Sequence, residues 1–177
     1  TEESGPLLIT HWGLSGPAIL KISAWKAREL ADLKYNFEIL VNFLGLDKES
    51  AEDLFKNYRD KNSKKTIGSS KIFEITNRFW HRILWLSKID LEKNISQLTK
   101  IEIQNLIENL CSRQLKVSGK STYKDEFVTA GGVNLKEINF KNMQSKLLPN
   151  FYLAGEVLNI DAVTGGFNFQ ACWSEAW

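Results

Sequence analysis

Glu156 and two pairs of glycines are the residues of this sequence whose types and spacing suggest binding chemistry. Glu156 follows Gly155 and a short apolar run, Phe151 to Ala154, which predicts a strand over 151–156. The carboxyl ends of strands are where α/β sheets bind ligands, and a carboxylate there accepts hydrogen bonds from hydroxyl groups. We therefore expect Glu156 to hold a polyol, such as a ribitol chain or a ribose. The alternative is an acid that only water solvates.

The glycine pairs suggest a second kind of contact. Thr164, Gly165 and Gly166 lead directly into an aromatic, helical pattern. A helix N-terminus offers unpaired N–H groups and a partial positive charge, and glycines leave it accessible. Gly131 and Gly132 end a β-prone run, so we expect backbone angles that other residues resist, or a close approach by another group. Together with Glu156 these glycines predict a polyol-plus-anion ligand, with simple turns as the alternative.

Composition sets limits on the other classes of function. The chain has 177 residues, of which 43% are hydrophobic and 25% charged, which is typical of a soluble globular protein. Its net charge of +2 gives no general argument for nucleic acid or acidic membranes. Cys111 and Cys172 form no CxxC pattern, and the two histidines show no metal-ligand spacing. We expect a cytoplasmic protein without a metal, and we expect neither membrane nor nucleic acid as a partner.

Hydrophobic spacing predicts an α+β chain with a helical middle. Apolar residues recur at helical spacing in three segments, which predicts helices over 16–33, 49–61 and 99–112. Ser15 before Gly16-Pro17 is typical of a helix cap, and Thr99 with Glu102 forms a capping-box pattern. The segments 37–43 and 114–119 alternate as half-buried strands do. The last dozen residues read as a helix.

Three blocks of the sequence resemble a known family. "THWGLSGPAIL", "EFVTAGGV" and "KEI…KNMQSKLLPNFYLAGEVLNIDAVTGGFNFQACW" are similar to the BaiN-type NAD(P)/FAD-dependent oxidoreductases, the aminoacetone-oxidase-like bacterial flavoproteins. The resemblance extends over nearly the whole chain, in the family's order. Members are considerably longer and begin with a dinucleotide-binding βαβ unit carrying GxGxxG, a motif absent here. The resemblance therefore implies a fragment: an insert domain over 1–125, and over 126–177 the C-terminal strand–turn–helix of an FAD-binding Rossmann-like domain.

The resemblance also implies site residues, cofactors and partners. FAD is the expected cofactor, NAD(P)H the expected reductant, and the expected partners are a small-molecule substrate and the missing dinucleotide-binding domain. The residues implied to contact FAD are Thr129, Ala130, Gly131, Gly132, Val133, Gly155, Glu156, Thr164, Gly165, Gly166, Phe167 and Asn168. Among them, Glu156 is expected at the ribitol, and the helix after Gly166 at the pyrimidine edge of the flavin, where its N-terminus stabilises negative charge.

The turn before that helix departs from the family pattern. Asn159 stands where an acid is expected, and Ala162 where a glycine is usual. Asp161 lies in the same turn, and we expect it to support the turn instead of contacting the ligand.

Further hypotheses concern catalysis, binding and a structural role. His11 and Ser15 lie in the loop expected to face the flavin, so they are candidates for a substrate-side role; a structural histidine and a capping serine are the alternative.

A different function, a helical module that binds nucleic acid or protein, would use the basic stretch 56–71, whose cationic residues are Lys56, Arg59, Lys61, Lys64, Lys65 and Lys71. A third possibility is a structural helical domain that covers a partner's active site. Alone, the fragment is expected to be inactive and to bind FAD weakly.

Overall fold

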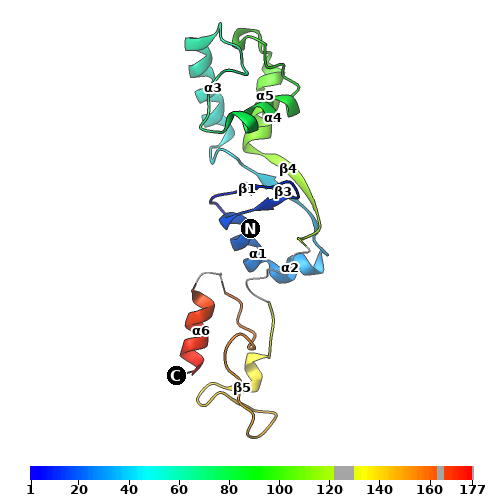
Figure 1. Ribbon diagram of the computed structural model, residues 1–177, viewed down its shortest axis with the longest axis vertical. Coiled ribbons are helices and arrows are strands. Elements are labelled where there is room, and N and C mark those ends of the chain that lie inside the picture. Colours follow the sequence, from blue (N-terminus) through cyan, green and yellow to red (C-terminus); the bar gives the residue numbers. More distant parts are fainter. Residues whose placement is uncertain (122–129, 163–165, 177) are drawn as a thin grey trace. The chain divides into compact units, whose positions relative to one another are not determined.

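The computed structural model describes residues 1–121, 130–162 and 166–176, which are drawn in colour in Figure 1. These residues form two compact units. One, the helical unit, is residues 37–117, and the other, the glycine-rich unit, combines residues 1–36 with residues 118–177. Each unit is described by itself. The predicted boundary near residue 125 lies outside the described residues.

The helical unit holds three helices around one core (Figure 1). Its elements are β3 Asn36–Val41, α3 Lys48–Asn62, α4 Asn77–Leu86, the short 3-10 helix η1 Ile95–Gln97, α5 Lys100–Cys111 and β4 Arg113–Ser118. The two strands pair with each other in a two-stranded sheet. The predicted helices over 49–61 and 99–112 are confirmed, as are the strands near 37–43 and 114–119.

Apolar side chains from the helices and from the segments between them build this core. The fully buried members with the largest side chains include Phe55, Ile67, Ile83, Leu84, Ile95, Leu106, Ile107 and Leu110. Trp80 packs among them and its indole Nε1–H donates to the carbonyl of Ile67, 3.0 Å away. Burial of each such side chain contributes about 1.5–3 kcal/mol, so the helical unit carries its own hydrophobic stabilisation.

Side-chain caps fix where the helices begin. Asp47 accepts a hydrogen bond of 2.7 Å from the backbone N–H of Ser50 at the start of α3, and this bond lowers the pKa of Asp47. Thr76 caps α4 in the same way. The predicted capping box of α5 is confirmed, because the Glu102 N–H donates to Thr99 Oγ1 at 3.2 Å and the Thr99 N–H donates back to Glu102 Oε2 at 2.8 Å.

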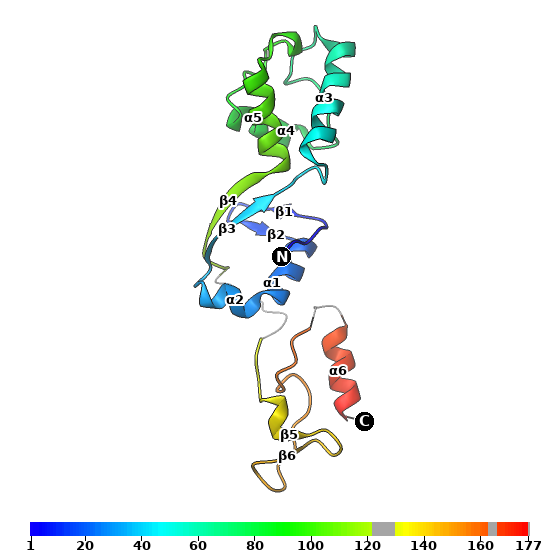
Figure 2. The same ribbon diagram turned by 180° about the vertical axis from the view of Figure 1, so that it is seen from behind.

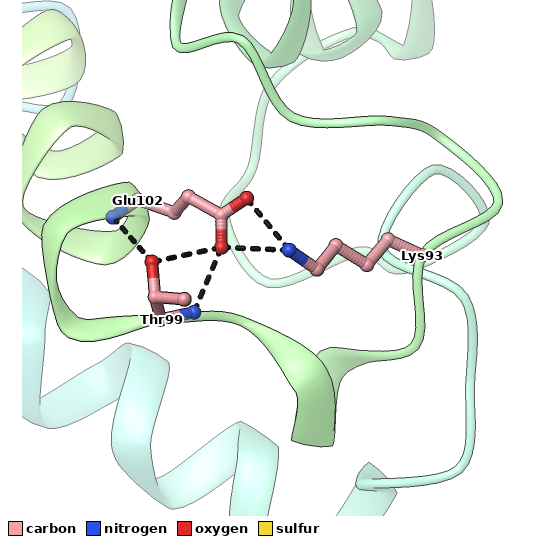
Figure 3. Close-up of polar contacts among 3 residues, drawn as sticks. All are labelled: Lys93, Thr99 and Glu102. Atoms are coloured by element: carbon pink, nitrogen blue, oxygen red, sulfur yellow. Dashed lines mark hydrogen bonds and ion pairs between the residues drawn. The ribbon is translucent and has the colours of Figure 1, made fainter.

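Lys93 extends the capping box into a three-residue cluster (Figure 3). Its ammonium group lies 2.7 Å and 2.9 Å from the two carboxylate oxygens of Glu102. The hydrogen bond from Lys93, together with that from the Thr99 backbone, lowers the pKa of Glu102. The cluster fastens the loop before α5 to the first turn of that helix.

The first part of the glycine-rich unit is a short hairpin followed by two helices. β1 Leu8–Ile9 pairs antiparallel with β2 Leu14–Ser15, and α1 Pro17–Trp25 and α2 Ala27–Asp32 follow. The single helix predicted over 16–33 is wrong, because Lys26 leaves helical geometry with φ −111° and ψ 15°. The capping role predicted for Ser15 is also wrong: Ser15 belongs to β2, and the cap position is Gly16, without a side-chain bond.

The second part of the glycine-rich unit holds η2 Leu135–Glu137, β5 Ile138–Asn139, β6 Gln144–Ser145 and α6 Phe167–Ala176 (Figure 2). β5 and β6 pair antiparallel. The helix predicted at the C-terminus is confirmed as α6. The strand predicted over 151–156 is wrong, since this segment makes one bridge, between Gln144 and Tyr152, and Gly155 and Glu156 already belong to a turn. A strand needs a continuous hydrogen-bonding neighbour, and the described residues supply one only at that bridge.

The α+β class is confirmed, but the two units differ in their cores. Among the described residues of the glycine-rich unit, the buried hydrophobic side chains are Ala18, Ile138 and Leu158. Large apolar side chains are instead exposed there, among them Trp12, Trp25, Phe167, Phe169 and Trp173. This unit therefore presents apolar faces that its own described residues do not cover.

Candidate flavin-contacting loops

The loop at Gly131 is held in place by a carboxylate from a distant turn. The backbone N–H of Gly131 donates a hydrogen bond of 3.0 Å to Asp161 Oδ1. The other oxygen of Asp161 accepts a hydrogen bond of 2.6 Å from the guanidinium of Arg28 on α2, which also donates to Asn159 Oδ1. Asp161 thus supports the loop at Gly131, whereas the sequence suggested that it supports its own turn. Asn159, where an acid was expected, shares the same arginine.

Glycine serves a different structural purpose at each of the two glycine positions of this loop. Both have positive φ, +105° at Gly131 and +141° at Gly132, as predicted for positions that other residues resist. A Cβ on Gly132 would lie 2.5 Å from the carbonyl oxygen of Val157 and 2.8 Å from that of Leu158. Gly132 therefore permits the backbones to approach. A Cβ on Gly131 would meet nothing within 4 Å, so the loop is open on that side.

A parallel bridge joins the loop to the turn that carries Glu156. The Val133 N–H donates to the Val157 carbonyl at 2.9 Å, and the Asn159 N–H donates to the Val133 carbonyl at 3.0 Å. Leu158, in the middle of this pairing, is 1% exposed. The loop over 130–133 and the turn over 155–159, which the sequence separates by more than twenty residues, are therefore adjacent backbone segments.

The turn itself combines a fixed glycine with an exposed acid. Gly155 has φ +89°, and its N–H donates to Glu175 Oε2 of α6. Glu156 is exposed, and its carboxylate has no hydrogen-bond or ion-pair partner among the described residues. Its position in a turn, instead of at a strand end, leaves the carboxylate available to a ligand or to water.

Gly166 precedes α6, and the described residues leave space around it. Gly166 has φ +139°, its carbonyl accepts the N–H of Gln170 at 2.9 Å, and a Cβ there would meet nothing within 4 Å. Phe167 is exposed. Asn168 Oδ1 and Glu175 Oε1 are buried atoms without a hydrogen-bond partner in the part of the chain that the structure describes.

The structure does not describe all the other residues that were predicted to contact FAD. Thr129, Thr164 and Gly165 lie outside the described residues. Ala130 is exposed and belongs to no regular element. Sequence reasoning missed Arg28 and Glu175 as supports of the loops, and no local pattern points to them, because their partners lie far away in the sequence.

Of the two candidates for a substrate-side role, His11 lies in the turn between β1 and β2, and Ser15 lies in β2. His11 is exposed and its ring lies 4.2 Å from that of Trp12, centroid to centroid. Ser15 is half-buried and pairs with Leu8 in the hairpin. The turn is closed by Thr10, whose Oγ1 donates to the Gly13 carbonyl at 2.9 Å. A catalytic role for His11 or Ser15 stays a prediction.

The structure also bears on membrane spans, metal sites and the cysteines. None of the helices built from described residues has both the length and the apolar character needed to cross a bilayer. In the same residues, no three side chains of His, Cys, Asp or Glu gather as a metal site would require. The Cys111 thiol is buried in α5, and this burial raises its pKa.

Comparison with known proteins identifies relatives over almost the whole chain. It is 30% identical over 97% of its length to the ribosomal RNA dihydrouridine synthase of Escherichia coli, and 29% identical to the protein of that name from Haemophilus influenzae. It is 26% identical to the 3-dehydro-bile acid delta(4,6)-reductase of Clostridium scindens. The chain spans 40% of the length of the first two relatives and 43% of the third.

A protein family matches the larger part of the chain. Residues 1–128 fit the family described as HI0933-like protein barrel and H2TH domain. Together with the relatives, this match confirms the resemblance to BaiN-type flavoproteins that the sequence blocks indicate. The chain belongs to the HI0933-like family and is a domain related to flavoprotein oxidoreductases.

Proposed function

We propose that this chain is part of an FAD-dependent oxidoreductase that uses NAD(P)H as its reductant. The observation that carries the proposal is the bridged pair of loops. Asp161 accepts the Gly131 N–H and so holds the loop. A Cβ on Gly131 would meet no protein atom of the described residues within 4 Å, so there is space beside it. The loop pairs with the turn in which Glu156 is exposed. A loop that carries two glycines, is held by a carboxylate and is bordered by an acid suits a flat, polar cofactor.

The polar groups around these loops fit a flavin. Asn168 Oδ1 and Glu175 Oε1 are buried acceptors without partners among the described residues, and such atoms normally have one. The N–H and O–H groups of a flavin would satisfy them. Glu156 supplies a further acceptor for ribitol hydroxyls, and the first N–H groups of α6 supply donors for the pyrimidine oxygens.

Each residue then has a defined task. Glu156 binds the ribitol, Gly131 and Ala130 border the ring system, and the N-terminus of α6 stabilises negative charge near Gly166. Asp161 and Arg28 position the loop without touching the ligand. The chemistry that a bound flavin supplies is transfer of a hydride, taken from NAD(P)H, to an electron-poor double bond.

The names of the relatives favour a carbon–carbon double bond as the group that is reduced. Dihydrouridine is uridine with its 5,6 double bond reduced, and a delta(4,6)-reductase acts on double bonds of a steroid ring system. In both substrates the double bond is conjugated to a carbonyl, which makes it electron-poor. We propose uridine in ribosomal RNA as the substrate, because the two relatives with that name share the greater identity.

A small-molecule substrate, expected from the sequence, is the second candidate, and the relationship to the bile acid reductase favours it. We also propose that a dinucleotide-binding domain completes the flavin site. The chain spans 40% of its curated relatives, and exposed aromatic side chains such as Phe169 and Trp173 on α6 are suited to burial against such a domain.

The test uses the full-length protein that contains this chain. Purified protein is incubated with ribosomal RNA that lacks dihydrouridine, with NADH or NADPH, and the RNA is digested and analysed by mass spectrometry. A nucleoside heavier by two hydrogens supports the proposal. Absence of bound flavin and of any reduced product, with RNA and with conjugated steroid ketones, would reject it. The alternative of a binding module would then be favoured.

A further inference from the structure

The exposed face of α4 carries an unusual set of side chains. Arg78, Arg82 and Trp85 follow one another at intervals of four and three residues, so they share one face of the helix. All three are exposed, and Trp85 exposes 64% of its surface. The opposite face is buried in the core of the helical unit, through Trp80, Ile83 and Leu84. Trp85 is therefore not a core residue, and its ring is available for contact with a ligand.

Arg82 and Trp85 form a flat platform. The guanidinium carbon of Arg82 lies 4.0 Å from the centroid of the Trp85 ring. Such a cation–π contact fixes two planar groups against each other at the surface. Planar aromatic and guanidinium groups are the surfaces on which the unpaired bases of single-stranded nucleic acids stack.

A hollow of about 700 Å³ lies beside this platform. Four side chains of α4 line it, those of Arg78, His81, Arg82 and Trp85, together with residues 89–91 of the following loop. A second hollow, of about 480 Å³, shares Trp85 and adds Lys88. Both hollows are open depressions of the surface, so a base can lie beside Trp85 without displacing a side chain of the core.

The charge around the hollow is mainly positive. Neither Arg78 nor Arg82 forms an ion pair with any acid among the described residues. The ring Nε2–H of His81 donates to the Gly68 carbonyl at 3.0 Å, which fixes the imidazole at the rim. One acid, Asp90, also lines the hollow, and its Oδ1 accepts the N–H of Glu92 at 3.0 Å. Two unpaired guanidinium groups suit the phosphates of a polynucleotide.

The platform stands on a rigid support. At the end of α4, the Ser87 hydroxyl donates to the Ile83 carbonyl at 2.9 Å and accepts the amide N–H of Asn109 on α5 at 3.0 Å. Asn109 in turn accepts from Arg113 at 2.6 Å. The buried bond between Ser87 and Asn109 joins the end of α4 to α5, so the exposed face is fixed before a ligand binds, which lowers the entropic cost of binding.

We propose that this face of α4 binds an unpaired segment of RNA, with a base stacked on Trp85 and the backbone phosphates near Arg78 and Arg82. The choice of RNA rests on the proposed ribosomal RNA substrate, whereas the site itself needs no flavin chemistry. The basic stretch 56–71, the alternative in the sequence, is a less suitable surface, because it lines neither of these two hollows.

Fluorescence anisotropy of a labelled single-stranded RNA of about 12 nucleotides, titrated with the 177-residue chain, tests the proposal. Trp85→Ala is expected to weaken binding by about 5- to 10-fold, and Trp85→Phe to restore most of it, because phenylalanine keeps an aromatic face. Trp25→Ala is the matched control, since Trp25 is 58% exposed but lies on α1. Thermal melts of each variant show whether the fold is kept.

The salt dependence of RNA binding distinguishes phosphate contacts at α4 from a general attraction between RNA and the basic residues of the protein. Between about 50 and 200 mM salt, Arg82→Gln is expected to reduce the slope of log affinity against log salt by about 0.7, the value for one phosphate contact on a single strand. Lys61→Gln removes the same charge from α3 and is expected to leave the slope nearly unchanged.

Three results would overturn the proposal: no RNA binding, an equal affinity for Trp85→Ala and the wild type, or an equal change of slope for Lys61→Gln and Arg82→Gln. Tighter binding of an RNA duplex than of the single strand would overturn the stacking of an unpaired base. A full-length protein without flavin or reductase activity would reject the proposed function, but RNA binding that depends on Trp85 would still stand.

Discussion

The backbone N–H of Gly131 donates to the carboxylate of Asp161 across 3.0 Å, and thirty residues of sequence separate the two. Asp161 is in turn held by Arg28, so an arginine, a carboxylate and a backbone amide form one chain of charge-assisted bonds. Such bonds are stronger than neutral ones. The loop at Gly131 is therefore held by a carboxylate that lies thirty residues away in the sequence.

Asp161→Ala is expected to lower the free energy of unfolding by about 1 kcal/mol, because the Gly131 amide and the Arg28 guanidinium both lose their acceptor, while the partial exposure of the pair limits the loss. Urea unfolding of the 177-residue chain measures it. Glu29→Gln, which breaks the exposed pair with Lys26, is the control and should change stability by less than about 0.5 kcal/mol. An equal effect of both variants would contradict the supporting role of Asp161.

Neighbouring glycines should respond differently to the same substitution. Gly132→Ala is expected to cost more than about 3 kcal/mol, because the new Cβ would lie 2.5 Å from the Val157 carbonyl oxygen. Gly131→Ala adds backbone strain alone, about 1 kcal/mol, since its Cβ meets nothing within 4 Å. Urea unfolding curves compare the two variants directly. Equal costs would show that the pairing of Val133 with Leu158 does not constrain the loop.

The Lys93–Thr99–Glu102 cluster predicts acid sensitivity of the helical unit. Hydrogen bonds from Lys93 and from the Thr99 backbone hold the pKa of Glu102 below its ordinary value of 4.5. A lowered pKa means that the contribution of Glu102 to stability is complete above about pH 4.5 and is lost as the pH falls through the folded-state pKa.

Glu102→Gln should therefore destabilise the protein near neutral pH and change it little at strongly acidic pH. Thermal melts at a series of pH values measure the difference, with Glu92→Gln as a control outside the cluster. A constant difference between wild type and Glu102→Gln across the whole series would contradict the linkage.

Glu156→Ala is expected to weaken FAD binding by the full-length protein without lowering its melting temperature in the absence of FAD. Loss of one charged acceptor corresponds to roughly 10- to 150-fold in affinity. Because the Glu156 carboxylate is exposed and has no partner among the described residues, no internal bond is lost. Flavin titration followed by fluorescence quenching gives the affinity. Unchanged affinity would remove the ribitol role and leave a solvated acid.

The parts of the fold that depend on local sequence were predictable. The capping box at Thr99 and Glu102 and the amphipathic spacing of Phe55 and its neighbours act within one or two helical turns, so the sequence alone reveals them. The break at Lys26 and the loss of a strand at 151–156 were not predictable, because the first is a backbone adjustment in a continuous apolar pattern and the second depends on a partner segment.

The candidate site was predictable in part. Paired glycines and an acid revealed the loops, because positive φ restricts those positions to few residue types. Arg28, Asp161 and Gly131 come together only in three dimensions, and the same holds for Glu175 and Gly155. The face of α4 was missed because Arg78, Arg82 and Trp85 look like ordinary surface positions until the hollow beside them is seen.

FAD affinity of full-length Gly166→Val tests the central claim, a flavin at the start of α6, most directly. Gly166 has φ +139° and Gly119 has φ +158°, both are exposed, and neither has a protein atom within 4 Å of a Cβ position. Gly119→Val therefore places the same branched side chain at an exposed glycine outside the site. The account predicts that wild type binds FAD stoichiometrically, that Gly166→Val weakens binding at least about tenfold, and that Gly119→Val changes it less than about twofold. Equal affinities for both variants, or a wild-type protein that does not bind FAD, would contradict it.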